Sequence, residues 1–187
     1  MAGFTFKFEG LSDVLQVFDE LSREIGDKRA QSKVLIPAVR KVMQPVLAAA
    51  QQNAPVDTGG LRLSLQVEAR RPTRKDRRSK YVSNTDVVIA AVTTASGRKL
   101  KQMSEGKGLE RARRRLVKMG MEQKDAARFM GVDSDARAIA QEFGTAKTPQ
   151  QMYLRPALEN NANAVANDLG KALATQIEKY KTRKVKK

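Results

Sequence analysis

The chain has 187 residues, which suits one domain with an attached arm or tail, and 36 Lys and Arg against 20 Asp and Glu give it a net charge of +16. It contains no cysteine and no histidine, which excludes disulfides and thiolate metal sites and removes the commonest general base at neutral pH. The charge predicts attraction to polyanions, and the missing residue types argue against catalysis, so we assign no catalytic, metal or cofactor-binding residue.

The first elements predicted are a short strand and an amphipathic helix. Phe4, Phe6 and Phe8 alternate with polar residues, which is the period of a half-buried strand. Ser12 is a plausible N-cap for a helix that ends near Gly26. The opening residues lack the pattern of a signal peptide, and no run approaches the roughly 20 apolar residues of a membrane helix. We therefore expect a soluble protein without a membrane partner.

A longer helix is predicted from about Ser32 to Ala54. Its apolar residues recur at helical spacing, Pro45 should kink it, and Pro55 should stop it. The following VDTGG supplies two glycines that are free to take positive φ in a turn.

Two strands should follow, with a basic loop between them. Leu61 to Glu68 alternates apolar and polar residues, and Val87 to Val92 is typical of a more buried strand. The segment 70–80 between them is predicted to be an exposed hairpin loop. Its candidate contacts for a partner or polyanion are Arg70, Arg71, Arg74, Lys75, Arg77 and Arg78.

From Ser96 the chain becomes basic and weakly helical. Residues 96–131 are predicted to be a helical insertion with further candidate contacts at Arg111, Arg113, Arg114 and Arg115. A short helix should end at Phe143, and a terminal helix should open at Pro156. We expect a single domain over residues 1–178 and a basic tail over 179–187.

Two features of the sequence suggest chemistry or ligand binding, and each has an alternative structural explanation. Asp57-Thr58-Gly59 matches the triplet of aspartic proteases, but it follows a helix rather than an aliphatic strand, which favours a turn. The basic runs could bind nucleic acid through phosphates, yet they contain a single aromatic residue, Tyr180, for base stacking. Solvated loops, or loops that order against an acidic neighbour, are the alternative, and both readings stay open.

Two patterned segments carry a family resemblance. The first is APVDTGGLRLSL, residues 54–65, and the second is QEFGTAKTPQQMYLRPAL, residues 141–158. In this order, ahead of a terminal helix, they resemble the tail-completion or head–tail joining (neck) proteins of long-tailed bacteriophages. The motif residues are Pro55, Asp57, Thr58, Gly59, Leu61, Glu142, Phe143, Gly144, Tyr153, Leu154, Arg155 and Pro156.

The resemblance implies an α+β fold, in which a small antiparallel or mixed sheet of about four strands packs against the long kinked helix and the C-terminal helix, with long basic loops. It implies a structural virion protein that caps or completes the tail tube and joins tail to head. The expected partners are copies of itself in a hexameric ring, the tail tube protein, a head-closure or connector ring, and genomic DNA passing through the lumen. The expected locations are the virion and, during assembly, the host cytoplasm. A non-specific nucleic-acid-binding protein that uses its basic loops and tail is the alternative.

Overall fold

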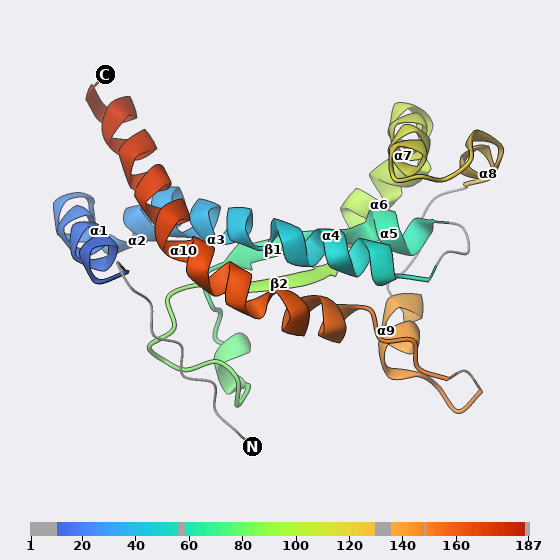
Figure 1. Ribbon diagram of the computed structural model, residues 1–187, viewed down its shortest axis with the longest axis horizontal. Helices are drawn as coiled ribbons and strands as arrows, with labels where there is room; N and C mark the ends of the chain where they lie inside the picture. The colour runs from blue at the N-terminus through green and yellow to red at the C-terminus, as the bar shows by residue number, and fades with distance from the viewer. Residues whose placement is uncertain (1–10, 56–58, 130–135, 148, 186–187) are drawn as a thin grey trace. The chain divides into compact units, whose positions relative to one another are not determined.

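The computed structural model describes residues 11–55, 59–129, 136–147 and 149–185. Its elements, labelled in Figure 1, are α1 (Leu11–Ile25), α2 (Asp27–Ala30), η1 (Gln31–Leu35), α3 (Ile36–Val42), α4 (Gln44–Asn53), α5 (Gly60–Ser64), β1 (Leu65–Arg70), η2 (Asp76–Arg78), β2 (Ile89–Thr94), α6 (Gly97–Ser104), α7 (Gly106–Lys118), α8 (Gln123–Ala127), α9 (Ala136–Phe143) and α10 (Leu154–Val185). They fall into two compact units. The first draws on Met1–Gln44, Glu68–Ala91 and Asn161–Lys187, and the second on Pro45–Val67 and Val92–Asn160.

The core of the first unit is built from α1, η1, α3 and α10. Leu21 of α1 and Val34 of η1 are buried together with Leu173 and Ile177 of α10. In α10, Leu169, Leu173 and Ile177 recur four residues apart, so they share one face of the helix. These residues form the apolar seam of the helix, whereas Leu158 near its start is 49% exposed, and the helix continues through Val185.

Two prolines shape the long helical region between residues 27 and 53. Pro37 lacks an N–H and crowds the carbonyl four residues earlier, and a π-helical turn, η1, precedes it at Gln31–Leu35. Near Pro45 the long helix is interrupted, because α3 ends at Val42 and α4 begins at Gln44. Pro45 thus occupies the first turn of a new helix, where its missing N–H costs little.

The described residues contain a two-stranded antiparallel sheet of β1 and β2, so the α+β class is confirmed. The Ala95 N–H donates to the Ser64 carbonyl at 2.6 Å and continues the pairing beyond the strands. The strand predicted at Phe4–Phe8 lies outside the described residues.

The strand predicted at Leu61–Glu68 is wrong in its first half, where residues 60–64 form helix α5. The alternation of Leu61, Leu63 and Leu65 also places two leucines four residues apart, which suits one helical turn. Tertiary packing decides between the two, because Leu63 is buried in a helical cluster. The chain becomes extended at Leu65, where β1 begins.

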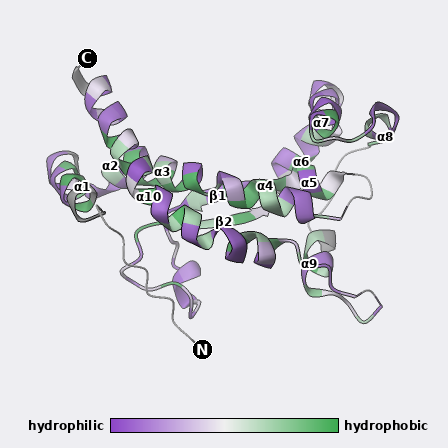
Figure 2. Cartoon of the chain, in the orientation of Figure 1, coloured by the Kyte–Doolittle hydropathy of each residue, from purple (hydrophilic) through white to green (hydrophobic). Residues whose placement is uncertain are grey.

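The second unit has a separate core in which α5, α7 and α8 meet. Leu63 of α5 is buried against Ala112 and Leu116 of α7, together with Ala126 of α8 and the nearby Phe129. The segment 96–131, expected as a basic helical insertion, thus contains α6, α7 and α8. In Figure 2, α6 and α7 carry much of the hydrophilic colour, whereas α4 shows both hydrophobic and hydrophilic residues.

Candidate functional site

The buried carboxylate of Glu142 caps the start of α10. The backbone N–H groups of Tyr153 and Leu154 each donate to Glu142 Oε2 at 2.9 Å, and that of Arg155 donates to Oε1 at 3.2 Å. Pro156, next in the chain, has no N–H to satisfy. A helix otherwise leaves its first amides without partners and carries partial positive charge at that end, so one carboxylate both bonds these amides and complements the helix dipole.

The side chain of Tyr153 also holds the start of α10 against α9. Its side chain is among the largest that are fully buried, and its hydroxyl donates to the Ala138 carbonyl at 3.3 Å. Burial, and then the nearby Glu142 carboxylate, raises the pKa of Tyr153 to about 12. The phenol therefore stays neutral and acts as a hydrogen-bond donor at physiological pH.

A glycine turn links α9 to this cap. α9 ends at Phe143, and Gly144 has φ of +76°, which is the left-handed conformation that glycine adopts readily after a helix. The Gly144 N–H donates to the Ala140 carbonyl at 2.8 Å, and the Gln151 N–H returns to the Gln141 carbonyl at 2.7 Å. The stretch 141–158 is thus an architectural corner between two helices.

From the sequence we expect the Arg155 guanidinium to pair with Glu142, with Asp57 or with a neighbouring subunit. Glu142 bonds the Arg155 backbone, and the Arg155 side chain is exposed. Asp57 lies outside the described residues, so its pairing with Arg155 remains a prediction.

The first motif is held by a glycine and an arginine. Gly59 is buried with φ of +71°, and a Cβ there would lie 2.5 Å from Leu116 Cδ2 and 2.8 Å from Met121 Cε. Arg62 donates to the carbonyls of Gln52 at 3.1 Å and Ala54 at 3.3 Å, which caps the end of α4. Sequence reasoning missed Arg62. The sequence did contain one indication of this role, because Arg62 lies eight residues after the predicted end of the helix at Ala54, close enough in the chain to reach its last carbonyls.

Pro55 and Leu61 of the first motif are partly buried, whereas Asp57 and Thr58 lie outside the described residues. The described residues in and beside the triplet therefore have structural roles: Gly59 allows close packing on Leu116, and Arg62 caps α4. Among the described residues, no group of three or more Asp and Glu is arranged to hold a metal ion.

Exposed apolar side chains surround the corner. Ile139 and Phe143 of α9 are 59% and 69% exposed, and Leu158 of α10 is 49% exposed. Ile139 and Phe143 line a shallow pocket that also includes Val92, Thr93 and Thr94 of β2. Large apolar side chains gathered at the surface are typical of a protein–protein contact.

The basic loop after β1 uses two of its arginines internally. Arg70 donates to Glu68 at 2.7 Å and to both carboxylate oxygens of Asp76, and these bonds hold the pKa of Asp76 well below its usual range. Arg77 donates to the carbonyls of Ser83 and Asn84 at 2.8 and 2.6 Å. The remaining predicted contacts of the loop are exposed, namely Arg71, Arg74, Lys75 and Arg78.

The predicted contacts on α7 divide in the same way. Arg113 is half-buried and donates to the Phe129 carbonyl at 3.2 Å, so it belongs to the internal structure. Arg111, Arg114 and Arg115 are exposed. Three of the ten predicted cationic contacts, Arg70, Arg77 and Arg113, therefore have internal roles.

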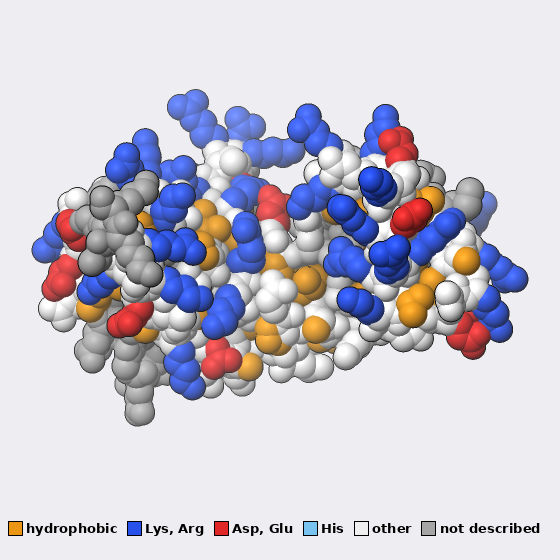
Figure 3. All heavy atoms as spheres, turned by 90° about the horizontal axis from the view of Figure 1, so that it is seen from above, with side chains coloured by type: hydrophobic (Ala, Val, Ile, Leu, Met, Phe, Trp, Pro, Cys, Tyr) orange, Lys and Arg blue, Asp and Glu red, His pale blue; other side chains and the backbone are white. Residues whose placement is uncertain are grey.

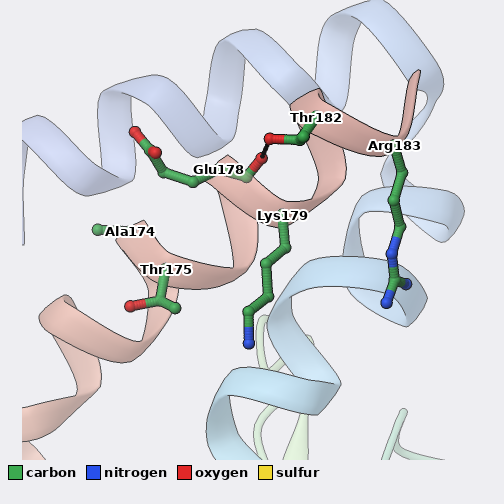
Figure 4. A pocket seen from close by; sticks show the side chains of 6 residues that line it. All are labelled: Ala174, Thr175, Glu178, Lys179, Thr182 and Arg183. Carbon is green, nitrogen blue, oxygen red and sulfur yellow. Dashed lines mark hydrogen bonds between the residues drawn. The ribbon is translucent and has the colours of Figure 1, made fainter. Parts of the chain in front are cut away.

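A further open groove runs along the C-terminal half of α10, and the residues that line it all come from that helix (Figure 4). Lys179 and Arg183 lie one turn apart and extend to the same side, while the Thr182 hydroxyl donates to the Glu178 carbonyl at 2.8 Å. One helix face without converging groups from other elements is a poor site for a small ligand. Across the described residues, no helix is both long and apolar enough to span a membrane.

Comparison with known protein families gives a match over part of the chain. Neither the curated proteins nor the solved structures contain a significant relative. Residues 16–97, a little under half of the chain, match the HK97-gp10-like family, described as "Bacteriophage HK97-gp10, putative tail-component". The matched region includes the first motif and ends before the second. Residues 16–97 are therefore similar to a family of phage tail components, in agreement with the resemblance predicted from the sequence.

Proposed function

We propose that this protein is a structural component of the phage neck that caps or completes the tail tube and joins it to the head. The observation that carries the proposal is the family match over residues 16–97, which begins within α1, continues past β2 and includes the APVDTGGLRLSL motif. A tail component belongs to the virion and contacts other virion proteins. The neck role, the ring and the two partner rings go beyond that match.

Surface chemistry supports an assembly role. The exposed side chains of Ile139, Phe143 and Leu158 would lose contact with water in an interface between subunits or with a partner ring. Homo-oligomers close by symmetry, and a sixfold ring would match a sixfold tail tube. Exposed cations on the 70–80 loop would then steer docking onto acidic partner surfaces.

The test combines the purified chain with purified tails that lack it. Light scattering after size exclusion gives the mass, and negative-stain images show whether sixfold rings with an open centre form alone or on the tail ends. Phe143→Ser should weaken ring formation or tail binding at least tenfold, because an exposed phenylalanine contributes little to the fold and much to an interface.

Val87→Ser is the matched control, because Val87 is 48% exposed but lies outside the corner. It should leave assembly unchanged. A chain that stays monomeric and ignores both tails and heads would overturn the proposal. The alternative, a nucleic-acid-binding protein, is favoured by the basic face of α7 alone and predicts retention on DNA without any affinity for tails.

A further inference from the structure

Helix α7 has two faces of opposite character. Leu109, Ala112 and Leu116 point into or against the core of the second unit. Five cations lie on the opposite side, all exposed: Lys107, Arg111, Arg114, Arg115 and Lys118. Successive residues of an α-helix are 100° apart, so these five fall within an arc of roughly 100°, in a row about 16 Å long.

The five cations are available to a partner. Elsewhere in this region Lys101 lies 4.0 Å from Glu105, Lys124 lies 2.9 Å from Glu122, and Lys99 donates to Gln66. Within the described part of the chain, by contrast, the five of the row form no ion pair and no side-chain hydrogen bond. Glu110 is the one acid of α7, at the edge of the row. Figure 3 shows Lys and Arg side chains gathered on the face that includes this helix.

The chemistry of this face fits phosphates better than a protein surface. Protein interfaces depend on a desolvated centre with aromatic or aliphatic anchors. On α7 the exposed apolar side chain is Val117, 41% exposed, and it lies outside the cationic arc. A row of Arg and Lys without anchors can instead neutralise phosphates and release their counterions.

The face also favours duplex over single-stranded nucleic acid. Binding of a single strand relies on aromatic side chains that stack on the bases, and α7 contains none. Contacts to the backbone of a duplex need cations at the surface and no access to base edges.

We propose that the exposed face of α7 binds the phosphate backbone of double-stranded DNA without reading its sequence. This inference does not rest on the neck role, because the isolated chain tests it without heads or tails. It assigns the contact to α7 in preference to the 70–80 loop, where Arg70 and Arg77 are engaged internally.

The experiment is a titration of the full chain onto a fluorescent duplex of arbitrary sequence, at salt concentrations from 50 to 200 mM. At about 0.9 per phosphate in the log–log salt slope, five contacts predict roughly 500-fold weaker binding across that range, and two contacts predict about tenfold. The variant Arg111→Gln/Arg114→Gln/Arg115→Gln should therefore bind weakly and lose most of its salt dependence.

The matched control, Arg71→Gln/Arg74→Gln/Arg78→Gln, removes the same charge from exposed positions of the loop and should bind within about threefold of the wild type. Replacing the three α7 arginines by lysine should retain binding, because the backbone contact depends on charge. Circular dichroism checks that each variant is folded.

Three results would overturn the proposal. Equal losses in the α7 and loop variants would assign binding to net charge rather than to this face. Tighter binding of a single strand than of the duplex would contradict the duplex assignment. An α7 variant that keeps its affinity for DNA but no longer binds purified tails would show that the helix docks on an acidic protein.

Discussion

The cap that Glu142 provides can be tested by replacing the carboxylate. It is 6% exposed and accepts three backbone N–H bonds from the start of α10. Glu142→Ala leaves these amides without a partner, and the Tyr153 amide is buried. Glu142→Gln keeps the shape but turns an amide NH₂ toward N–H donors and removes the charge that complements the helix dipole.

The magnitude follows from the type of bond. A hydrogen bond to a charged group contributes about 1.5–3 kcal/mol, and losing a helix N-cap costs about 0.5–2 kcal/mol, but three bonds to one carboxylate are not additive. We expect Glu142→Ala to lower the free energy of unfolding by about 3–4 kcal/mol and Glu142→Gln by about 2 kcal/mol. The second value is smaller because one oxygen still accepts.

Urea unfolding followed by circular dichroism measures both changes as shifts in the midpoint at constant slope. Glu159→Gln is the control, because Glu159 is an exposed carboxylate one turn into the same helix, and its loss should change stability by less than about 0.5 kcal/mol. Hydrogen exchange at the Tyr153, Leu154 and Arg155 amides should accelerate in the Glu142 variants alone. A Glu142→Ala protein that matched the control in both measurements would refute the capping role.

Three further changes test the packing around the two motifs. Gly59→Ala should cost about 2–3 kcal/mol in urea unfolding, because the new Cβ would lie 2.5 Å from Leu116 Cδ2, whereas Gly120→Ala, at φ of +91° with no atom within 4 Å, should cost about 1 kcal/mol; equal costs would refute the packing argument. The pKa of Tyr153 is raised from 10.0 to about 12, so the stability that it contributes is complete below pH 10 and is lost as the pH rises to 12. That loss is about 2–3 kcal/mol, and urea unfolding at these pH values should show it in the wild type and not in Tyr153→Phe. Arg62→Ala should cost about 1 kcal/mol and speed hydrogen exchange in the last turn of α4, and an unchanged exchange rate there would argue against the cap.

Local chemistry made several features predictable from the sequence. The break near Pro45 follows from a missing N–H, and the seam of Leu169, Leu173 and Ile177 follows from helical periodicity. The turn at Gly144 could also be predicted, since a glycine after an apolar helix marks a helix end. Each of these features depends on a few neighbouring residues, so contacts with distant parts of the chain have little influence on it.

The errors arose where distant residues decide the outcome. Leu61 to Leu65 satisfies a strand and a helical turn equally, and burial of Leu63 against Leu116, over fifty residues away, selects the turn. The role of Glu142 was hidden for the same reason, because its three partners are eleven to thirteen residues further along the chain. The cationic runs could not be divided into internal and available residues until the acceptors of Arg70, Arg77 and Arg113 were known.

Leu116 connects the family-matched segment to the basic face of α7. Its side chain lies against Gly59, inside residues 16–97, while Arg114 and Arg115 on the same helix face solvent. The matched segment ends before α7, and Leu116 of α7 packs on Gly59 of the first motif. A residue larger than glycine at position 59 would force the side-chain ends of Leu116 and Met121 to move. Because Leu116 anchors α7 in the core of the second unit, we expect Gly59→Ala to weaken duplex binding in the fluorescence titration, and unchanged binding would show that the cationic row does not depend on this packing.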